Sequence, residues 1–375
     1  MINLAFKSVL YCWRRYLPVI IAVGISGLMM VVQAALAMGA FSLSAAPVRL
    51  SQADLWIGPA DAVALDQSRG LSELAIGRLW LDPDITRIEP FTNPNYVSIG
   101  DNEETGQMGL VTPLPIGADP MLLARAIPDD LRQKLRDPGT IIIDRTDARK
   151  LGVALGDRLR VNRQSLRVVA LADGVRAMFG IQLIMSELTA RDLAPGGGTN
   201  PAFYLARLRA GADPQVVAER LAQGIPQPEY RVWQPSDLSA ATVRSWALGS
   251  GAGTLFLASS AIALVITLMV VSQTLGAAVA GAMREYAALR AYGISFRAVQ
   301  WVVMKQGLYV CLAALVLTAL ASLVVLWALH QRGVASELPV PLAAAVAAGL
   351  ALTVVISNLL ALRRLRRADP ASLLR

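Results

Sequence analysis

Four stretches of the chain contain no Asp, Glu, Lys or Arg, and they constrain its fold more than any other feature. They cover residues 16–48, 245–283, 306–331 and 338–362. Each is longer than the roughly 20 residues with which a helix crosses the hydrocarbon core of a bilayer. The first is also too long for the apolar core of a secretory signal peptide, which has about 7–15 residues. The sequence therefore predicts an α-helical membrane protein with four transmembrane helices.

The same stretches place a large mixed α/β extracytoplasmic domain between the first two transmembrane helices. We expect an amphipathic cytoplasmic segment over 1–16, transmembrane helices over 17–46, 245–283, 306–330 and 339–362, the outer domain over 47–244, a cytoplasmic connection over 284–305, a short external loop over 331–338 and a basic cytoplasmic tail over 363–375. The outer domain is assigned as α/β because short β-rich runs alternate there with helical patterns and turn residues. Eight runs are expected as strands: ADLWIG, NYVSIG, GTIIID, DRLRVN, SLRVVAL, IQLIMS, FYLARLR and YRVWQ.

The orientation follows from the basic residues near the ends of the apolar stretches, which stay on the cytoplasmic side of a membrane. The N-terminal segment, the connection over 284–305 and the tail hold three, four and five Lys or Arg, whereas the loop over 331–338 holds one. We therefore expect both termini and the long connection to be cytoplasmic, and the outer domain to lie on the opposite side.

The net charge of +8 could suggest a nucleic-acid partner, but its distribution excludes one. Residues 47–250 contain 22 Lys and Arg against 24 Asp and Glu, whereas the rest of the chain contains 13 against 3. The basic excess thus belongs to the segments that flank the membrane. No basic stripe with interleaved aromatic residues is present in the outer domain.

Residues that carry chemistry are scarce. His330 is the single histidine, and Cys12 and Cys311 fall in or beside apolar stretches, so the sequence indicates no disulfide and no His or Cys metal site. Asp144 and Asp147 form a carboxylate pair, but their position between an expected strand and an expected helix favours capping. The chain also lacks the G-x-x-x-x-G-K-[ST] loop of nucleotide hydrolases. We therefore expect a non-catalytic protein, and nothing in the outer domain identifies a cargo or a pocket.

The connection MREYAALRAYGIS, which begins at Met283, has the pattern of a short helix between two membrane helices. Its alanines and leucine are good helix formers. Gly293 can end this helix in a left-handed cap, and Ser295 can cap the next one, which runs into the third apolar stretch. The same charges would also fit a solvated loop that only satisfies the positive-inside rule.

The whole arrangement resembles the ABC-type permeases of the MacB/FtsX superfamily, and among them the DevC-like exporter permeases. The resemblance rests on the four-helix plan with its outer domain, on REYAALRAYG in the connection, and on ADPASLLR at the C-terminus. It extends to ADLWIG, to IIIDRTDARKLGVALGD and to WALGSGAGTLF.

This resemblance implies a mechanotransmission permease of the inner membrane. Such a protein forms a homodimer and binds a separate ABC ATP-binding subunit, which holds the ATP and Mg. The permease transmits the motion of that subunit to its outer domain. Related exporters also use a periplasmic membrane-fusion adaptor and a TolC-like outer-membrane duct.

By position in the motif, the resemblance implies that Arg284, Glu285, Leu289, Arg290 and Gly293 form the coupling contact with the ATPase. Tyr292 departs from the aliphatic residue common at its position.

Two alternatives within the superfamily stay open: a permease that releases lipoproteins, and an FtsX-type activator of a cell-wall hydrolase. A membrane-embedded enzyme is a third class. The absence of charged residues from the four apolar stretches argues against it.

Overall fold

The computed structural model describes residues 7, 10–11, 13–67, 70–71, 73–100, 106–117, 119–193, 201–222, 230–281 and 295–367. The chain divides into two compact units, and each is considered by itself. Met1–Gly39 and Gly251–Arg375 form the first, which we call the membrane unit, and Ala40–Ser250 forms the second, which we call the outer unit.

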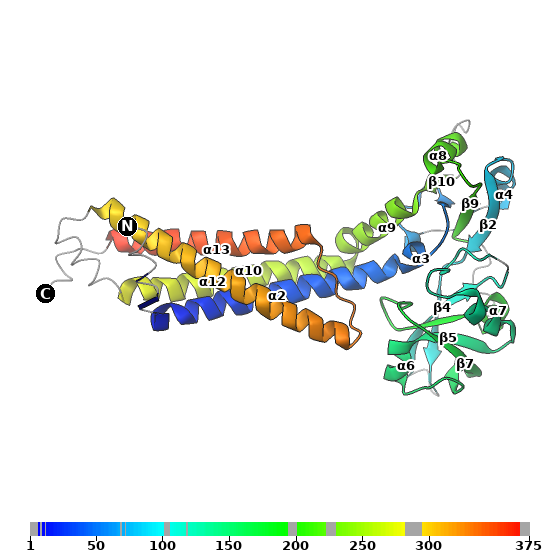
Figure 1. Ribbon diagram of the computed structural model, residues 1–375, viewed down its shortest axis with the longest axis horizontal. Coiled ribbons are helices and arrows are strands. Elements are labelled where there is room, and N and C mark those ends of the chain that lie inside the picture. The colour runs from blue at the N-terminus through cyan, green and yellow to red at the C-terminus, as the bar shows by residue number, and fades with distance from the viewer. Residues whose placement is uncertain are drawn as a thin grey trace. The chain divides into compact units, whose positions relative to one another are not determined.

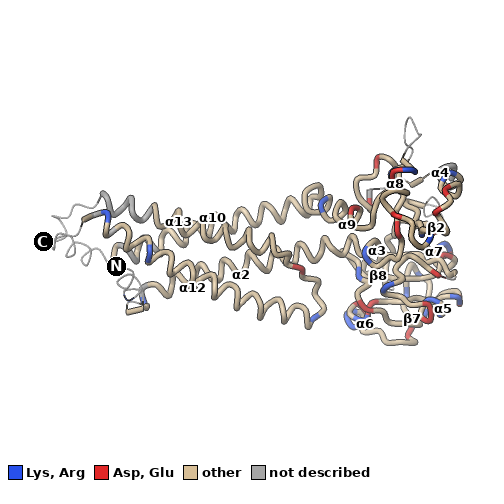
Figure 2. The backbone as a smooth tube through the Cα atoms, turned by 45° about the horizontal axis from the view of Figure 1, so that its top comes forward, with Lys and Arg blue, Asp and Glu red and all other residues tan. Residues whose placement is uncertain are grey.

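Four long helices make up the described part of the membrane unit: α2 (Trp13–Ser44), α10 (Gly251–Gly281), α12 (Phe296–Gln331) and α13 (Val340–Arg367). Each contains a span long and apolar enough to cross a membrane, with a mean hydropathy between 2.2 and 2.6. Figure 2 shows that charged residues are few along these helices and frequent in the outer unit. The predicted class, four transmembrane helices with an α/β domain between the first two, is confirmed.

Within the membrane unit, α13 packs along α10 and α12, and α2 joins them through a shared apolar cluster that includes Tyr16, Val23, Val310 and Val354. Small residues allow the closest approaches. A Cβ on Gly27 of α2 would lie 2.5 Å from Thr318 Oγ1 of α12. Without a hydrophobic driving force between helices in lipid, such close packing is a main source of their association.

The outer unit contains two β structures (Figure 1). The first is an antiparallel sheet in the order β10-β1-β9-β2, formed by β1 (Leu55–Pro59), β2 (Ile85–Phe91), β9 (Phe203–Leu208) and β10 (Tyr230–Trp233). The helix α4 (Glu73–Leu79) lies between β1 and β2 in the chain, and α8 (Pro214–Ala222) lies between β9 and β10. Val217 and Leu221 of α8 join Leu55 and Tyr204 in an apolar cluster, so α8 covers one face of this sheet.

The second β structure is a closed barrel in the order β3-β4-β8-β5-β7-β6. Its strands are β3 (Asn95–Ile99), β4 (Gln107–Leu114), β5 (Thr140–Asp144), β6 (Arg158–Val161), β7 (Gln164–Ala172) and β8 (Ile181–Ser186). The β4–β8 and β5–β7 pairs are parallel, and the others are antiparallel. Closure leaves the barrel without a free edge, which protects it from pairing with other chains.

Shorter helical segments complete the described part of the outer unit: α3 (Ala46–Arg49), η1 (Leu65–Gln67), α5 (Asp129–Gln133), η2 (Lys134–Arg136), α6 (Arg145–Leu151), α7 (Glu187–Leu193), α9 (Pro235–Arg244) and η3 (Ser245–Gly249).

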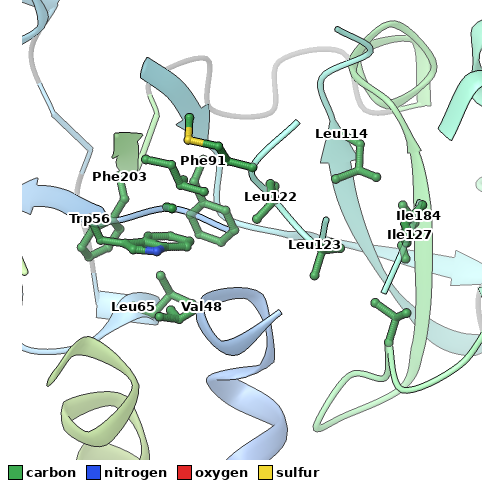
Figure 3. Packing of buried hydrophobic residues seen from close by; sticks show 14 of the residues in the cluster. Val48, Trp56, Leu65, Phe91, Leu114, Leu122, Leu123, Ile127, Ile184 and Phe203 are labelled. Atoms are coloured by element: carbon green, nitrogen blue, oxygen red, sulfur yellow. The ribbon is translucent and has the colours of Figure 1, made fainter. Parts of the chain in front are cut away.

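One apolar core joins the sheet to the barrel (Figure 3). Trp56 of β1 meets the rings of Phe91 and Phe203 edge-on, at centroid distances of 5.4 and 6.1 Å. Leu114 of β4 and Ile184 of β8 bring the barrel into the same cluster, and all five side chains are fully buried or nearly so. Because the two β structures share this core, each depends on the other for burial.

A buried acid and a buried base hold the loop between β4 and α5. Glu89 of β2 accepts hydrogen bonds from the backbone N–H groups of Met121 and Leu122, at 2.8 and 3.1 Å. Arg132 of α5 has no exposed surface and donates to the carbonyl oxygens of Leu122 and Pro115. Burial lowers the pKa of Arg132, and the charge of Glu89 opposes that shift.

All eight expected strands are present, but the sequence patterns did not predict β2 and β4. Each of these contains a proline, Pro90 and Pro113, and a proline lacks the N–H that a central strand donates. The structure tolerates both. The strand β2 lies at the edge of its sheet, and Pro113 lies beyond the last residue of β4 that pairs with β3.

We predict that Glu89→Leu destabilises the outer unit by about 3–5 kcal/mol, because it removes a countercharge of the buried Arg132 and the acceptor of two backbone N–H groups. Glu89→Gln keeps one acceptor oxygen and is expected to cost less. Urea unfolding of the purified full chain, followed by tryptophan fluorescence, measures both losses.

Glu187→Leu is the matched control. Glu187 is 40% exposed and lies 4.0 Å from Arg191, so its loss is expected to cost no more than about 1 kcal/mol. Equal losses at positions 89 and 187 would contradict the role given to Glu89.

Candidate functional site

The residues predicted to contact an ATPase, Arg284, Glu285, Leu289, Arg290 and Gly293, lie outside the described residues. So do the whole segment 282–294 and the C-terminal residues 368–375. The structure does describe the helices on both sides of that segment, since α10 ends at Gly281 and α12 begins at Phe296. The described part of the candidate site therefore consists of the helical ends that flank the segment.

Ser295 caps the helix that follows the segment, as the sequence predicts. Its backbone is extended, with φ −63° and ψ 146°, and its hydroxyl accepts from the N–H of Ala298 at 3.4 Å. The backbone N–H of Ala298 also donates to the Ser295 carbonyl, at 3.0 Å. The helix α12 then continues without interruption for 36 residues. A displacement of the segment would consequently be carried into one long rigid element.

Four uncharged polar residues lie between the membrane helices in the part of the unit that adjoins the segment. We call them the polar contact set: Ser272 of α10, Gln306 of α12, and Ser357 and Asn358 of α13. The hydroxyls of Ser272 and Ser357 are hydrogen-bonded at 3.1 Å. Gln306 and Asn358 are buried, with exposed fractions of 4% and 3%.

The helices α12 and α13 approach so closely at this set that only glycine fits. A Cβ on Gly307 would lie 2.5 Å from Asn358 Cγ, well inside van der Waals contact. In an apolar environment an interhelical hydrogen bond contributes about 0.6 kcal/mol on average and up to about 1.7. The set therefore fixes the register of α10, α12 and α13 more than it adds stability. The absence of charged residues from the apolar stretches does not reveal this set, because all four members are uncharged.

The two chain connections between the units differ in their backbone. On one side, α2 runs without a break to Ser44. On the other, α9 leads into a π-helical turn over Ser245–Gly249, and Ser250 is extended, with φ −94° and ψ 154°, before α10 begins. Such π turns occur often at functional positions of helices.

Asp144 and Asp147 have structural roles. Asp144 Oδ1 accepts from the N–H of Thr146 at 2.8 Å and so caps α6, which confirms the capping interpretation for this residue. Its Oδ2 accepts from the N–H of Val175 at 3.1 Å. Asp147 is buried and pairs with Lys150 at 3.0 Å. Among the residues that the structure describes, no group of three or more His, Cys, Asp or Glu is arranged to hold a metal ion.

An ion network around α8 also holds structure together. Arg220 of α8 binds both oxygens of Asp82 at 2.7 Å and one oxygen of Asp84 at 2.6 Å. Burial alone would raise the pKa of Asp82, but the hydrogen bonds from Arg220 and from the Asp84 N–H outweigh it, and the net pKa is lowered. A lowered carboxyl pKa stabilises the fold above the unfolded value and loses that effect as the pH falls through the folded one. This network therefore contributes at neutral pH and fails in acid.

We predict that Gly307→Ala destabilises the membrane unit by about 1–3 kcal/mol, because α12 and α13 must separate to admit the methyl group. Gly349→Ala on α13 is the matched control, since its Cβ would meet nothing closer than Leu264 at 3.8 Å. Thermal unfolding of the full chain in detergent measures both. Unchanged stability of the position 307 variant would contradict the close approach.

Two family models match the chain. A MacB-like periplasmic core domain matches residues 19–223, more than half of the chain, and an FtsX-like permease C-terminal model matches residues 257–370. No curated protein sequence matches.

Several solved structures are similar at low identity. The periplasmic region of MacB from Actinobacillus actinomycetemcomitans is 13% identical, and the match covers 52% of this chain and 94% of that one, with a TM-score of 0.34. A domain of a putative permease from Porphyromonas gingivalis is 17% identical, with coverages of 48% and 86% and a TM-score of 0.30. The extracellular domain of the noncanonic ABC-type transporter YknZ from Gram-positive bacteria is 15% identical, with coverages of 48% and 99% and a TM-score of 0.30.

Proposed function

The chain belongs to the MacB/FtsX superfamily of ABC-type permeases, and we propose that it transmits the ATP-driven motion of a separate subunit to its outer unit. Membership in this superfamily implies an ABC ATPase partner. The finer proposal is that the chain itself performs no chemistry and that the partner holds ATP and Mg. The transported molecule would then be moved from the periplasm or the outer leaflet.

The observation that carries this proposal is the arrangement of helices around the segment 282–294. That segment joins α10, which leads to the outer unit, to α12, which starts at a capped N-terminus and is held to α13 at Gly307 and Asn358. A push on the segment would therefore act on two long helices at once. One of them, α10, meets the outer unit at the break at Ser250, which is a position where the chain can bend.

We also propose the assembly and the orientation. The chain would work as a homodimer in the inner membrane, with both termini in the cytoplasm and the outer unit in the periplasm. An adaptor and a TolC-like duct would complete an export pathway. The support for the orientation is the excess of Lys and Arg in the N-terminal segment, in the connection 284–305 and in the tail.

We predict that Glu285→Lys lowers the stimulated ATPase activity of the ABC subunit that co-purifies with the chain by roughly tenfold or more. The reason is that a reversed charge at a protein contact costs several kcal/mol. Insertion into the membrane should be unchanged. The assay is ATP hydrolysis by the complex reconstituted in lipid nanodiscs.

Glu337→Lys is the matched control, since it makes the same charge change in the short loop between α12 and α13. It should leave the stimulation intact. Full stimulation in the Glu285→Lys complex would rule out the proposed coupling contact.

The orientation has its own test. In a chain whose Cys12 and Cys311 are replaced by alanine, Arg332→Cys should react with a membrane-impermeant maleimide in intact spheroplasts. Arg297→Cys, which is equally an exposed arginine, should react only after the membrane is permeabilised. The reverse pattern would invert the proposed topology.

A further inference from the structure

The outer unit contains a cavity of about 300 Å³ that no sequence pattern predicted. It is bounded by the last turn of α2 with α3, by η1, by strands β3, β4 and β8 of the barrel, by the loop between β7 and β8, and by η3. The volume is within the range of small-molecule sites in proteins.

The walls of the cavity are mainly apolar. Phe91, Leu110 and Leu123 contribute from β2, β4 and the connecting loop. Phe179 and Trp246 bring the β7–β8 loop and η3 together, with their ring centroids 5.9 Å apart and the rings tilted by 56°. The aromatic side chains offer flat apolar surface, which suits a molecule with rings or a hydrocarbon body.

Gln182 of β8 places an unused hydrogen-bond acceptor in this apolar wall. Gln182 is buried, with an exposed fraction of 7%. Its Nε2 donates to Thr112 Oγ1 at 2.7 Å and to the Leu110 carbonyl oxygen at 3.2 Å. Because a carbonyl can only accept, these contacts fix which end of the amide is nitrogen. Oε1 then accepts from no residue that the structure describes.

Trp246 of η3 places an unused donor in the same wall. Its indole N–H is shielded from solvent and forms no well-aligned hydrogen bond with a described acceptor, although the Asp66 carboxyl lies close to it. The nearby Asp66 of η1 has a carboxyl pKa that burial raises, an effect that its own backbone N–H and the neighbouring Trp246 partly offset. A buried N–H without a partner is costly, at about 1–3 kcal/mol.

The charges that line the cavity are balanced, with Asp66 as the single acid and Arg176 as the single base. This balance gives no preference for an anion or a cation. An uncharged occupant is therefore the best match to the wall.

We propose that this cavity binds a neutral, mostly apolar small molecule that donates a hydrogen bond to Gln182 Oε1 and accepts one from Trp246 Nε1. A hydroxyl on an aromatic or aliphatic body can both donate and accept a hydrogen bond. The cavity is lined by Leu43 and Ser44 from one connection to the membrane unit and by Trp246 from the other. A bound molecule would therefore contact both connections, and by preferring one of their arrangements it would shift the population toward that arrangement.

Binding of 1-naphthol, an uncharged two-ring phenol, tests the proposal without any partner subunit, so the result is independent of the proposed coupling to an ATPase. The full chain is placed in lipid nanodiscs and titrated calorimetrically, and the signal of empty nanodiscs is subtracted. We expect one saturable site. Gln182→Leu and Trp246→Phe should each weaken it by roughly tenfold, the worth of one hydrogen bond.

Two matched controls test whether the losses are local. Gln107→Leu changes an exposed glutamine at the far end of β4, and Trp80→Phe changes an exposed tryptophan outside the cavity. Both should bind as the parent chain does. Ala177→Trp, which fills the cavity, should abolish binding, and unfolding curves should show that each variant remains folded.

Three outcomes would overturn the proposal. The first is the absence of saturable binding above that of empty nanodiscs, which would leave water as the occupant. The second is binding that survives Ala177→Trp in a folded chain. The third is binding that neither Gln182→Leu nor Trp246→Phe weakens, because it would show that the two polar groups are not contacted.

Discussion

The shared apolar core of the outer unit is the constraint on which its other features depend. Trp56, Phe91 and Phe203 come from the sheet, and Leu114 and Ile184 come from the barrel, yet all five belong to one buried cluster. At roughly 25 cal/mol per Å² of apolar surface, neither β structure could expose its share of this cluster to water without a large loss of stability. The sheet and the barrel are therefore held together as one body.

Polar groups are also buried where the sheet meets the barrel. Glu89 of the sheet and Arg132 of α5 satisfy backbone groups of the loop between β4 and α5. Gln182 is half satisfied by Thr112 and Leu110, and its remaining acceptor adjoins an apolar cavity. A buried polar group that is fully bonded specifies structure, whereas Gln182 keeps one acceptor that no described residue uses.

The membrane unit follows a different rule, because lipid supplies no hydrophobic force to bring its helices together. Its helices associate instead through close packing at glycines and through a few hydrogen bonds. Gly27 admits Thr318, Gly307 admits Asn358, and Ser272 bonds to Ser357. These contacts are specific in geometry and modest in energy.

The sequence alone determined the architecture, because local patterns of apolar and charged residues predict both membrane spans and strands. It determined the four spans, eight of the strands, the caps at Asp144 and Ser295, and the superfamily. It missed β2 and β4, since Pro90 and Pro113 are allowed only by the edge and end positions that the sheets give them. Only the tertiary structure decided the shared core, the contact between Gly307 and Asn358, and the cavity around Gln182 and Trp246. Each of these joins residues far apart in the chain, and their proximity depends on packing that no local pattern records.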